Sequence, residues 1–218
     1  SQLTATGITK CGDYVYSFSG NSNNELDCWK TIDSDGDPVP AGQDGHYQTG
    51  KTMSYTVLTQ GGDTCVKDNV TGLIWEQKTN DGGLRDRNNT YSWYNPDSSI
   101  NGGSAGYKNE GRCSGSDCDT YAYINALNAS NYCSYSDWRM PTHSELVSLL
   151  DGSPRYTELI NRTVFPHTIG WYWTSSPHAD ESAGDGTSVA WFVDFNNGTV
   201  LHDYRFKAHY VRAVRASE

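Results

Sequence analysis

The sequence predicts an α+β protein built from antiparallel sheets, two short helices and long ordered loops. The 218 residues include 15 Tyr, 7 Trp and 22 Gly but only two Met, a mixture that favours short strands and ordered loops. Only two short segments carry the period near 3.6 residues that an amphipathic helix requires. The hydrophobic share of 35%, together with the glycines, is sufficient for a folded core.

The N-terminal third predicts hairpins followed by a first core strand. Residues 1–64 are rich in Gly, Asp, Ser and Thr and carry aromatic bursts such as Tyr14–Phe18, so we expect a hairpin-rich N-terminal part. The apolar run Val70–Trp75 predicts a compact strand within a core that spans residues 65–218. No internal repeat or linker divides the chain, and we expect one domain over residues 1–218.

A long polar segment separates this strand from two helices. Residues 79–118 are dominated by Asn, Asp, Gly and Ser, and a loop of this length in a compact domain is usually functional or locally pinned. We expect the rings of Tyr91, Trp93 and Tyr94 to pin it.

Both helices have start signals. Asp119 is an N-cap for a helix that continues to about Asn128, with Ile124 and Leu127 on one face. Thr142 and Glu145 have the spacing of a capping box, which predicts a second helix. We expect its buried stripe to consist of Leu146, Leu149 and Leu150.

The C-terminal third predicts an antiparallel meander. Trp171–Thr174 and Ala190–Phe195 are strands joined by a polar loop that ends at Ser188, and Asn197–Gly198 turns the chain back into a strand over Thr199–Tyr204. We expect the segment His209–Arg215 to close this sheet. Four indoles are expected in the core: Trp75, Trp138, Trp173 and Trp191.

Six cysteines in a chain of this composition suggest disulfides and an oxidising compartment. A metal site is the weaker alternative, because no Cys-x-x-Cys pair occurs. Six cysteines permit many pairings, and sequence proximity favours Cys11 with Cys28, Cys113 with Cys118, and Cys65 with Cys133.

Net charge and hydropathy limit the classes of partner and the location that the sequence predicts. The formal net charge of −10 repels phosphate backbones and sulfated polymers at long range, so nucleic acid is not expected. No stretch approaches the roughly 18 apolar residues of a membrane span, and Ser1 begins no signal-like run. We therefore expect a mature chain that is secreted or located on a bacterial cell surface, with no membrane span.

Four motifs together resemble the Lcl C-terminal-domain family, which includes the terminal domain of the Legionella collagen-like adhesin: Asp68–Trp75, Tyr135–Thr142, Trp173–Ser176 and Tyr210–Arg215. The lead-in segments Thr6–Cys11 and Gly42–Asp44 also look like members, so the resemblance spans nearly the whole chain. It implies a C-type-lectin-like fold, an extracellular bacterial location and adhesion, in a trimeric head that binds sulfated glycans. The negative net charge of this chain does not suit a sulfated ligand, which is also negatively charged.

An enzymatic reading finds little support in the sequence. Asp137–Glu145 also resembles a segment of the formylglycine-generating enzymes, which need reactive cysteines late in the chain. The last cysteine here is Cys133, and no Gly-x-Ser-x-Gly motif is present. We expect no enzymatic activity and no catalytic residues.

Calcium is the candidate cofactor. Asp33, Asp35 and Asp37 place three carboxylates on one tight turn, which suits a cation that seeks oxygen ligands. The segment is not an EF-hand loop, and a solvated acidic turn is the alternative.

Two loops offer exposed aromatics beside polar groups, the chemistry that a sugar face requires. The first supplies Arg85, Arg87, Tyr91, Trp93 and Tyr94; the second region supplies His178, Asp180, Glu181, Asp185, Tyr204 and Arg205. Alternatively, these aromatics fill gaps beneath long loops. The sequence thus predicts an extracellular binding or adhesion module for a carbohydrate or a surface protein, and the alternative is a self-associating structural subunit of a bacterial surface structure.

Overall fold

The computed structural model describes residues 10–12, 25–27, 52–152, 158–180 and 186–217. Within the N-terminal part, β1 (Lys10–Gly12) pairs antiparallel with β2 (Glu25–Asp27). The strand expected at Tyr14–Phe18 lies outside the described residues, so most of the hairpin-rich prediction for residues 1–64 stays a prediction.

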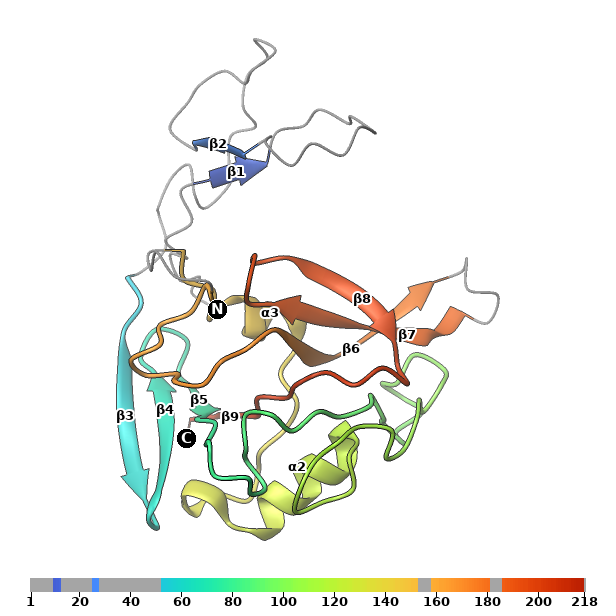
Figure 1. Cartoon of the computed structure of the whole chain (residues 1–218), viewed down its shortest axis with the longest axis horizontal. Helices are drawn as coiled ribbons and strands as arrows, with labels where there is room; N and C mark the ends of the chain where they lie inside the picture. Colours follow the sequence, from blue (N-terminus) through green and yellow to red (C-terminus); the bar gives the residue numbers. More distant parts are fainter. Residues whose placement is uncertain (1–9, 13–24, 28–51, 153–157, 181–185, 218) are drawn as a thin grey trace.

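A four-stranded antiparallel sheet forms one end of the protein (Figure 1). Its strand order is β3 (Tyr55–Gln60), β4 (Asp63–Asp68), β5 (Leu73–Glu76) and β9 (Val214–Ala216). The β3–β4 hairpin turns through Gly61 and Gly62, which both have the positive φ that a tight two-residue turn requires. The prediction that His209–Arg215 closes the C-terminal meander is confirmed only at Tyr210, which forms an isolated parallel bridge with Tyr172 of the meander; the final strand of the segment pairs with β5 instead. Ile74 faces Arg215 in this register, and the C-terminal end of the chain completes the first core sheet.

The second sheet is the predicted antiparallel meander. It consists of β6 (Trp171–Asp180), β7 (Gly186–Asp194) and β8 (Val200–Tyr204). The turn between β7 and β8 contains Gly198 with a φ of 78°, as the Asn-Gly pair predicts. Both β6 and β7 continue into the segment predicted as a polar loop, with a register shift between Trp173 and Pro177. The strands there do not keep a simple apolar alternation, which is why the sequence pattern missed them.

The helices begin where the capping signals place them. Helix α2 (Thr120–Ala129) starts after Asp119, whose carboxylate accepts a hydrogen bond from the amide of Ala122. Helix α3 (His143–Val147) has both hydrogen bonds of the predicted capping box, and a 3-10 turn, η1 (Tyr132–Ser134), lies between the helices. Leu146, Leu149 and Leu150 are buried, as expected.

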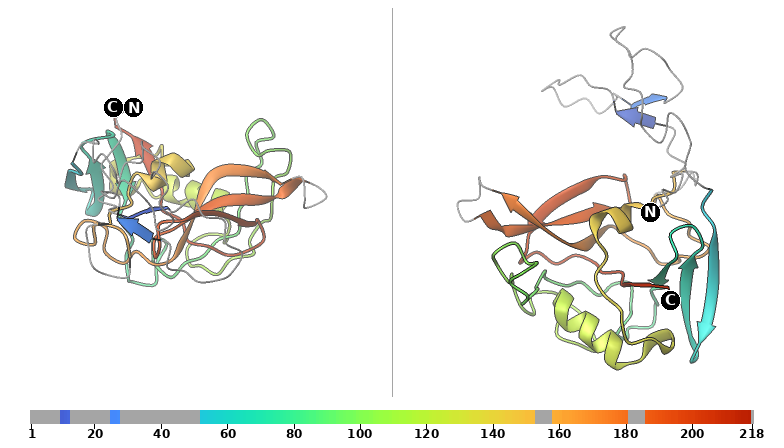
Figure 2. Two further views of the ribbon diagram at one scale, coloured as in Figure 1. Left: turned by 90° about the horizontal axis from the view of Figure 1, so that it is seen from above. Right: turned by 180° about the vertical axis from the view of Figure 1, so that it is seen from behind.

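Two groups of buried side chains fill the interior. One surrounds Trp93 and Trp173 and includes Tyr123 and Leu127 of α2; the other surrounds Trp75 and includes the leucines at α3. The β3–β4 hairpin and the strands β6 and β7 lie on different sides of the core (Figure 2). Helix α3 packs on β6 and β7, whereas α2 covers the other side of the core (Figure 1).

Three of the four indoles expected in the core are there. Trp75, Trp138 and Trp173 are buried, but Trp191 is only partly buried, so that prediction was wrong. Successive residues of a strand face opposite sides, and the neighbouring Phe192 takes the core position in β7. Trp191 instead packs against the rings of His178 and His202.

Two disulfides are present among the described residues. Cys65–Cys133 joins β4 to η1, and Cys113–Cys118 closes a short loop before α2, both as predicted. Cys28 lies outside the described residues, so the pairing of Cys11 with Cys28 stays a prediction. No helix in the described ranges is long and apolar enough to cross a bilayer.

Candidate functional site

The segment 79–118 contains no named helix or strand, yet it is closely attached to the core. The amide of Tyr91 donates to the carbonyl of His209 at 2.8 Å, and the indole nitrogen of Trp173 donates to the carbonyl of Tyr91 at 2.8 Å. The indole nitrogen of Trp93 reaches the carbonyl of Thr174 at 2.8 Å. Tyr91 and Trp93 therefore pin the loop, as predicted, but they are fully buried, and their predicted exposure to a ligand was wrong.

Arg205 fastens the same segment from the opposite side. Its Nε donates to the carbonyl of Val189 at 3.0 Å, while its Nη1 donates to the carbonyls of Asn101, at 2.9 Å, and Ser104. The guanidinium lies 4.2 Å from the ring centre of Trp93. Arg205 is fully buried, so its predicted exposure to ligand was also wrong: carbonyls of β7 and of the loop accept from its Nε and Nη1.

Arg85 attaches the beginning of the loop to the first sheet. It donates to the carbonyl of Gln77 at 2.9 Å and pairs with Asp63 at 3.1 Å, and its guanidinium lies 4.0 Å from the ring centre of Tyr132. Arg87 is half-buried in the same stretch. The geometry thus gives Arg85 a structural role, which is the alternative to ligand binding.

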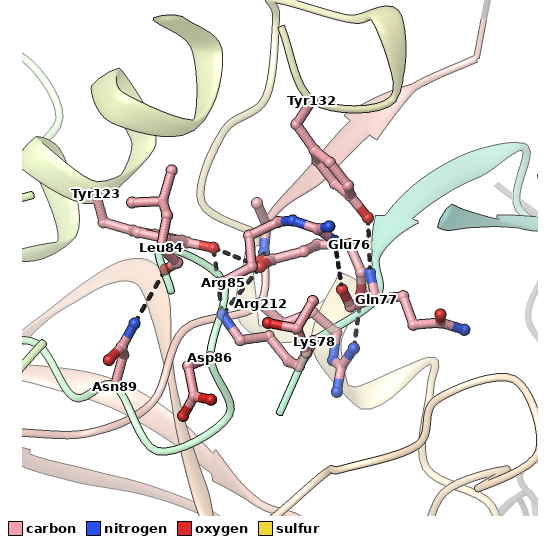
Figure 3. A network of polar contacts seen from close by, with 12 residues as sticks. Glu76, Gln77, Lys78, Leu84, Arg85, Asp86, Asn89, Tyr123, Tyr132 and Arg212 are labelled. Atoms are coloured by element: carbon pink, nitrogen blue, oxygen red, sulfur yellow. Dashed lines mark hydrogen bonds and ion pairs between the residues drawn. The ribbon is translucent and has the colours of Figure 1, made fainter. Parts of the chain in front are cut away.

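Beneath this loop lies a buried polar network (Figure 3). Glu76 accepts hydrogen bonds from Lys78 at 2.9 Å, from the hydroxyl of Tyr123, and from the amide of Ala213 at 2.9 Å. Arg212 donates to the carbonyl of Glu76 at 2.6 Å. Burial lowers the pKa of Lys78, while the Glu76 carboxylate opposes that shift. Glu76 contacts the cations of both Lys78 and Arg212, and the network joins β5, α2 and the C-terminal segment.

Three exposed rings gather where the loop meets the end of β8. Phe206 stacks on Tyr204 with ring centres 5.5 Å apart and an interplanar angle of 15°, and Tyr107 meets Phe206 edge to face at 5.7 Å. Each of the three side chains is between 44% and 47% exposed. We call Tyr107, Tyr204 and Phe206 the ring ledge. Tyr204 was predicted as a ligand residue, whereas Tyr107 and Phe206 were not.

A pocket opens beside Tyr94, on the same loop. Its volume is about 360 Å³, and its walls come from the loop, α2, the segment before α3, and β6. The lining is mainly apolar and consists of Trp93, Tyr94, Asn95, Ile100, Thr120, Tyr121, Ile124, Arg139, Met140, Thr142 and Ser175. Tyr94 is the one residue of the predicted ligand set, apart from the buried Trp93, that lines this pocket.

Comparison with known families gives an assignment at this point, because a sequence model of the Lcl C-terminal domain matches residues 64–215. The chain belongs to the Lcl C-terminal domain family. No curated protein and no solved structure shows a significant match. The matched range of the Lcl C-terminal domain contains both disulfides described above, the ring ledge and the pocket.

The remaining predicted ligand residues of this Lcl C-terminal domain do not form a described site. His178 stacks on His202 with ring centres 4.5 Å apart, beside Trp191. Glu181 and Asp185 lie outside the described residues, and of Asp180 only the strand backbone is described.

The acidic turn predicted to hold calcium also stays untested. Asp33, Asp35 and Asp37 lie outside the described residues. In the part of the chain that is described, no group of three or more His, Cys, Asp or Glu side chains is arranged to hold a metal ion.

Two residues of the ring ledge, Tyr107 and Phe206, were not predicted from the sequence. Phe206 and Lys207 follow the last residue of β8, and an aromatic at the end of a predicted hairpin strand could have been assigned to the surface. Tyr107 lies in the long loop, and only the fold brings it to Phe206.

Proposed function

We propose that this protein is an extracellular binding module of the adhesin type, which recognises a carbohydrate or another surface ligand through the ring ledge. The observation that carries the proposal is the contact of three half-exposed rings, Tyr107, Tyr204 and Phe206, on one surface. Aromatic faces stack on the apolar faces of sugars, and such rings are common anchors at binding surfaces.

Charged neighbours give the ring ledge hydrogen-bonding capacity. The ammonium of Lys207 lies 5.5 Å from the ring centre of Phe206 and supplies a donor at the ledge, whereas the ammonium of Lys108 lies over Tyr94, 5.1 Å from its ring centre. Lysine ammonium groups donate to hydroxyl and carboxylate oxygens. Rings flanked by donors suit a polyhydroxylated ligand better than a purely apolar one.

Rigid backing supports a recognition role. The buried Arg205 ties the loop that carries Tyr107 to the carbonyl of Val189 in β7. Two predicted disulfides are present, which fits an oxidising, extracellular setting. A surface that is ordered before binding loses less conformational entropy when the ligand arrives.

The fold is proposed to be C-type-lectin-like, in a single domain that acts by binding and not by catalysis. This proposal is supported by membership of the Lcl C-terminal domain family, by the two helices, and by the pairing of the C-terminal strand β9 with β5. In such a fold, an early strand and the last strand of the core pair with each other, and the long loops extend from the resulting sheets.

Glycan-array binding, with and without calcium, tests the proposal. We expect the full chain to bind a restricted set of glycans, and we expect Tyr204→Ala and Phe206→Ala each to weaken that binding by about tenfold, because each removes a stacking face. Val57→Ala is the matched control, since Val57 is 47% exposed on β3, away from the ring ledge. Failure of the folded protein to bind any glycan in either condition would remove the carbohydrate version.

The ring ledge could equally form an interface between copies, as the structural-subunit alternative requires. Mass measurement in solution separates the two functions. If Phe206→Ala converts an oligomer to a monomer and no glycan competes with assembly, the structural-subunit function replaces the adhesin function.

A further inference from the structure

The pocket beside Tyr94 is a second binding feature, separate from the ring ledge. Its volume of about 360 Å³ is in the range of small-ligand sites and exceeds the roughly 150 Å³ of a cavity that holds one benzene ring. The pocket thus has room for a side chain as large as an indole.

The pocket walls are held in place without a ligand. The hydroxyl of Thr120, the first residue of α2, donates to the carbonyl of Tyr94 at 2.9 Å and accepts from its amide at 3.0 Å. Arg139 is held through two backbone hydrogen bonds with Val214, each 2.9 Å long. The indole nitrogen of Trp93 donates a hydrogen bond to the carbonyl of Thr174 in β6. A partner therefore meets a formed concavity.

The charge of the lining is already neutralised. Arg139 donates through both terminal nitrogens to the two carboxylate oxygens of Glu145, at 2.7 and 2.8 Å. Thr142 accepts the Glu145 amide at 3.2 Å, and Asn95 accepts the amide of Asp97 at 3.0 Å. A charged occupant would lose its hydration without gaining an unpaired opposite charge, so the pocket favours a neutral one.

The chemistry of the walls favours an aromatic occupant over an aliphatic one. Tyr94 and Tyr121 meet edge to face with ring centres 5.9 Å apart. Thioether sulfur, as in Met140, and planar guanidinium, as in Arg139, both interact favourably with aromatic rings. Ile100 and Ile124 supply branched apolar surface.

The pocket rim indicates the size of the partner. Ile100 is 58% exposed and Tyr121 is 46% exposed, so apolar surface extends beyond the concavity. A small molecule inside the pocket would leave this surface in water. A polypeptide that inserts one ring and lies across the rim would cover it, as anchor residues do at protein interfaces.

We propose that this pocket is a docking site for a protein partner, which inserts a neutral aromatic side chain between α2 and the loop at Tyr94 and covers Ile100 and Tyr121 with its flanking uncharged residues. The site depends on the pocket alone and is independent of glycan binding at the ring ledge.

Backbone NMR shifts provide the first test. Titration with N-acetyl-tryptophanamide is expected to shift the amides of Tyr94, Ile124 and Met140 in a saturable way, whereas N-acetyl-leucinamide is expected to shift them much less. Selection from a randomised peptide library then identifies longer ligands. We expect the selected peptides to share a Trp, Phe or Tyr with uncharged neighbours and to bind at least about tenfold more tightly than the free amide, because they also cover the rim.

Two variants keep the test sharp. Ile124→Trp fills the pocket and is expected to reduce the affinity of the selected peptides by at least about tenfold. Ile100→Ser changes the rim only and is also expected to weaken peptide binding. It cannot disturb the core, since Ile100 is exposed. Leu201→Ser, 48% exposed on β8, is the matched control. Peptides without a shared aromatic, unchanged binding to both variants, or saturable binding of indole with no peptide that improves on it would each overturn the proposal. Loss of glycan binding in Phe206→Ala with the peptide affinity retained would show that the two sites are separate.

Discussion

The four-stranded sheet that Cys65–Cys133 joins to η1, which we call the frame, and the loop of residues 79–118 are both ordered, but by different interactions. The frame pairs strands β3, β4, β5 and β9 through regular backbone hydrogen bonds. The loop has only isolated bridges, and its backbone is satisfied by buried side chains such as Arg205, Ser92 and Asn89. Regular pairing tolerates many sequences, whereas the loop depends on a few particular polar groups. Changes to each region should separate these two kinds of order.

Removal of the Cys65–Cys133 bridge is expected to have the largest effect on stability. The bridge spans 68 residues, so the replacement of both cysteines by Ala should lower the free energy of unfolding by about 4 kcal/mol through the greater entropy of the unfolded chain. Urea unfolding followed by tryptophan fluorescence measures it. A loss as small as that from the Cys113–Cys118 pair would mean that the frame does not depend on its long-range link.

Lys78→Met is expected to lower the free energy of unfolding by about 3 kcal/mol, because it removes the ion pair with the buried Glu76 carboxylate, which then keeps only its hydrogen bonds from Tyr123 and Ala213. The double variant Glu76→Gln/Lys78→Met should recover part of this loss, and the double-mutant cycle gives the coupling. Lys67→Met, on the neighbouring strand β4 and outside this network, is the control. Equal stability of Lys78→Met and the parent protein would contradict the role given to the network.

Replacement of Cys113 and Cys118 by Ala is expected to cost about 2 kcal/mol, since the bridge closes a loop with a sequence separation of only 5. The effect should concentrate near the start of α2, where the carbonyl of Cys118 accepts the amide of Ser92 at 3.1 Å. Hydrogen exchange should therefore increase at Ser92 and Thr120 and stay unchanged in β3 and β4. Faster exchange throughout the frame would show that the two regions are not distinct.

The smallest expected effect is a pH dependence at His209, where the loop meets the C-terminal segment. Burial lowers the pKa of His209 below its ordinary value, although its hydrogen bond to Asp203, at 2.9 Å, opposes the shift. The unfolded chain therefore binds the proton more readily, and stability should be fully present above the ordinary histidine pKa and decrease as the pH falls through it. Melting curves across mildly acidic pH measure this, with His209→Gln as the comparison. A protein that becomes more stable in that window would reverse the assigned sign.

The same contrast explains what the sequence could predict. Helix starts at Asp119 and Thr142, the turn at Gly198 and the Cys113–Cys118 bridge depend on local signals, and all were predicted correctly. The Cys65–Cys133 pair was also predicted correctly, although its sequence separation is 68. The pairing of β9 with β5 joins residues about 140 positions apart, and no local pattern specifies it.

Site prediction failed where residue type alone cannot distinguish surface from interior. Trp93 and Arg205 have the chemistry of a ligand site, but in the fold they contact each other and the loop backbone. Conversely, the helix pattern placed Ile124 on one face with Leu127, and the fold buries Leu127 but leaves Ile124 lining an open pocket. The ring ledge depends on a contact between Tyr107 and Phe206 that only the tertiary structure creates.

Arg205 attaches the loop to β7 without a bound ion. The cation here is a side chain: its guanidinium donates to the carbonyls of Val189 and Asn101 and is part of the chain itself. Dilution or a chelating agent can remove a bound metal ion but not a side chain, and guanidinium groups stay protonated over a wide pH range. The attachment of the loop to β7 should therefore persist in the presence of a chelating agent.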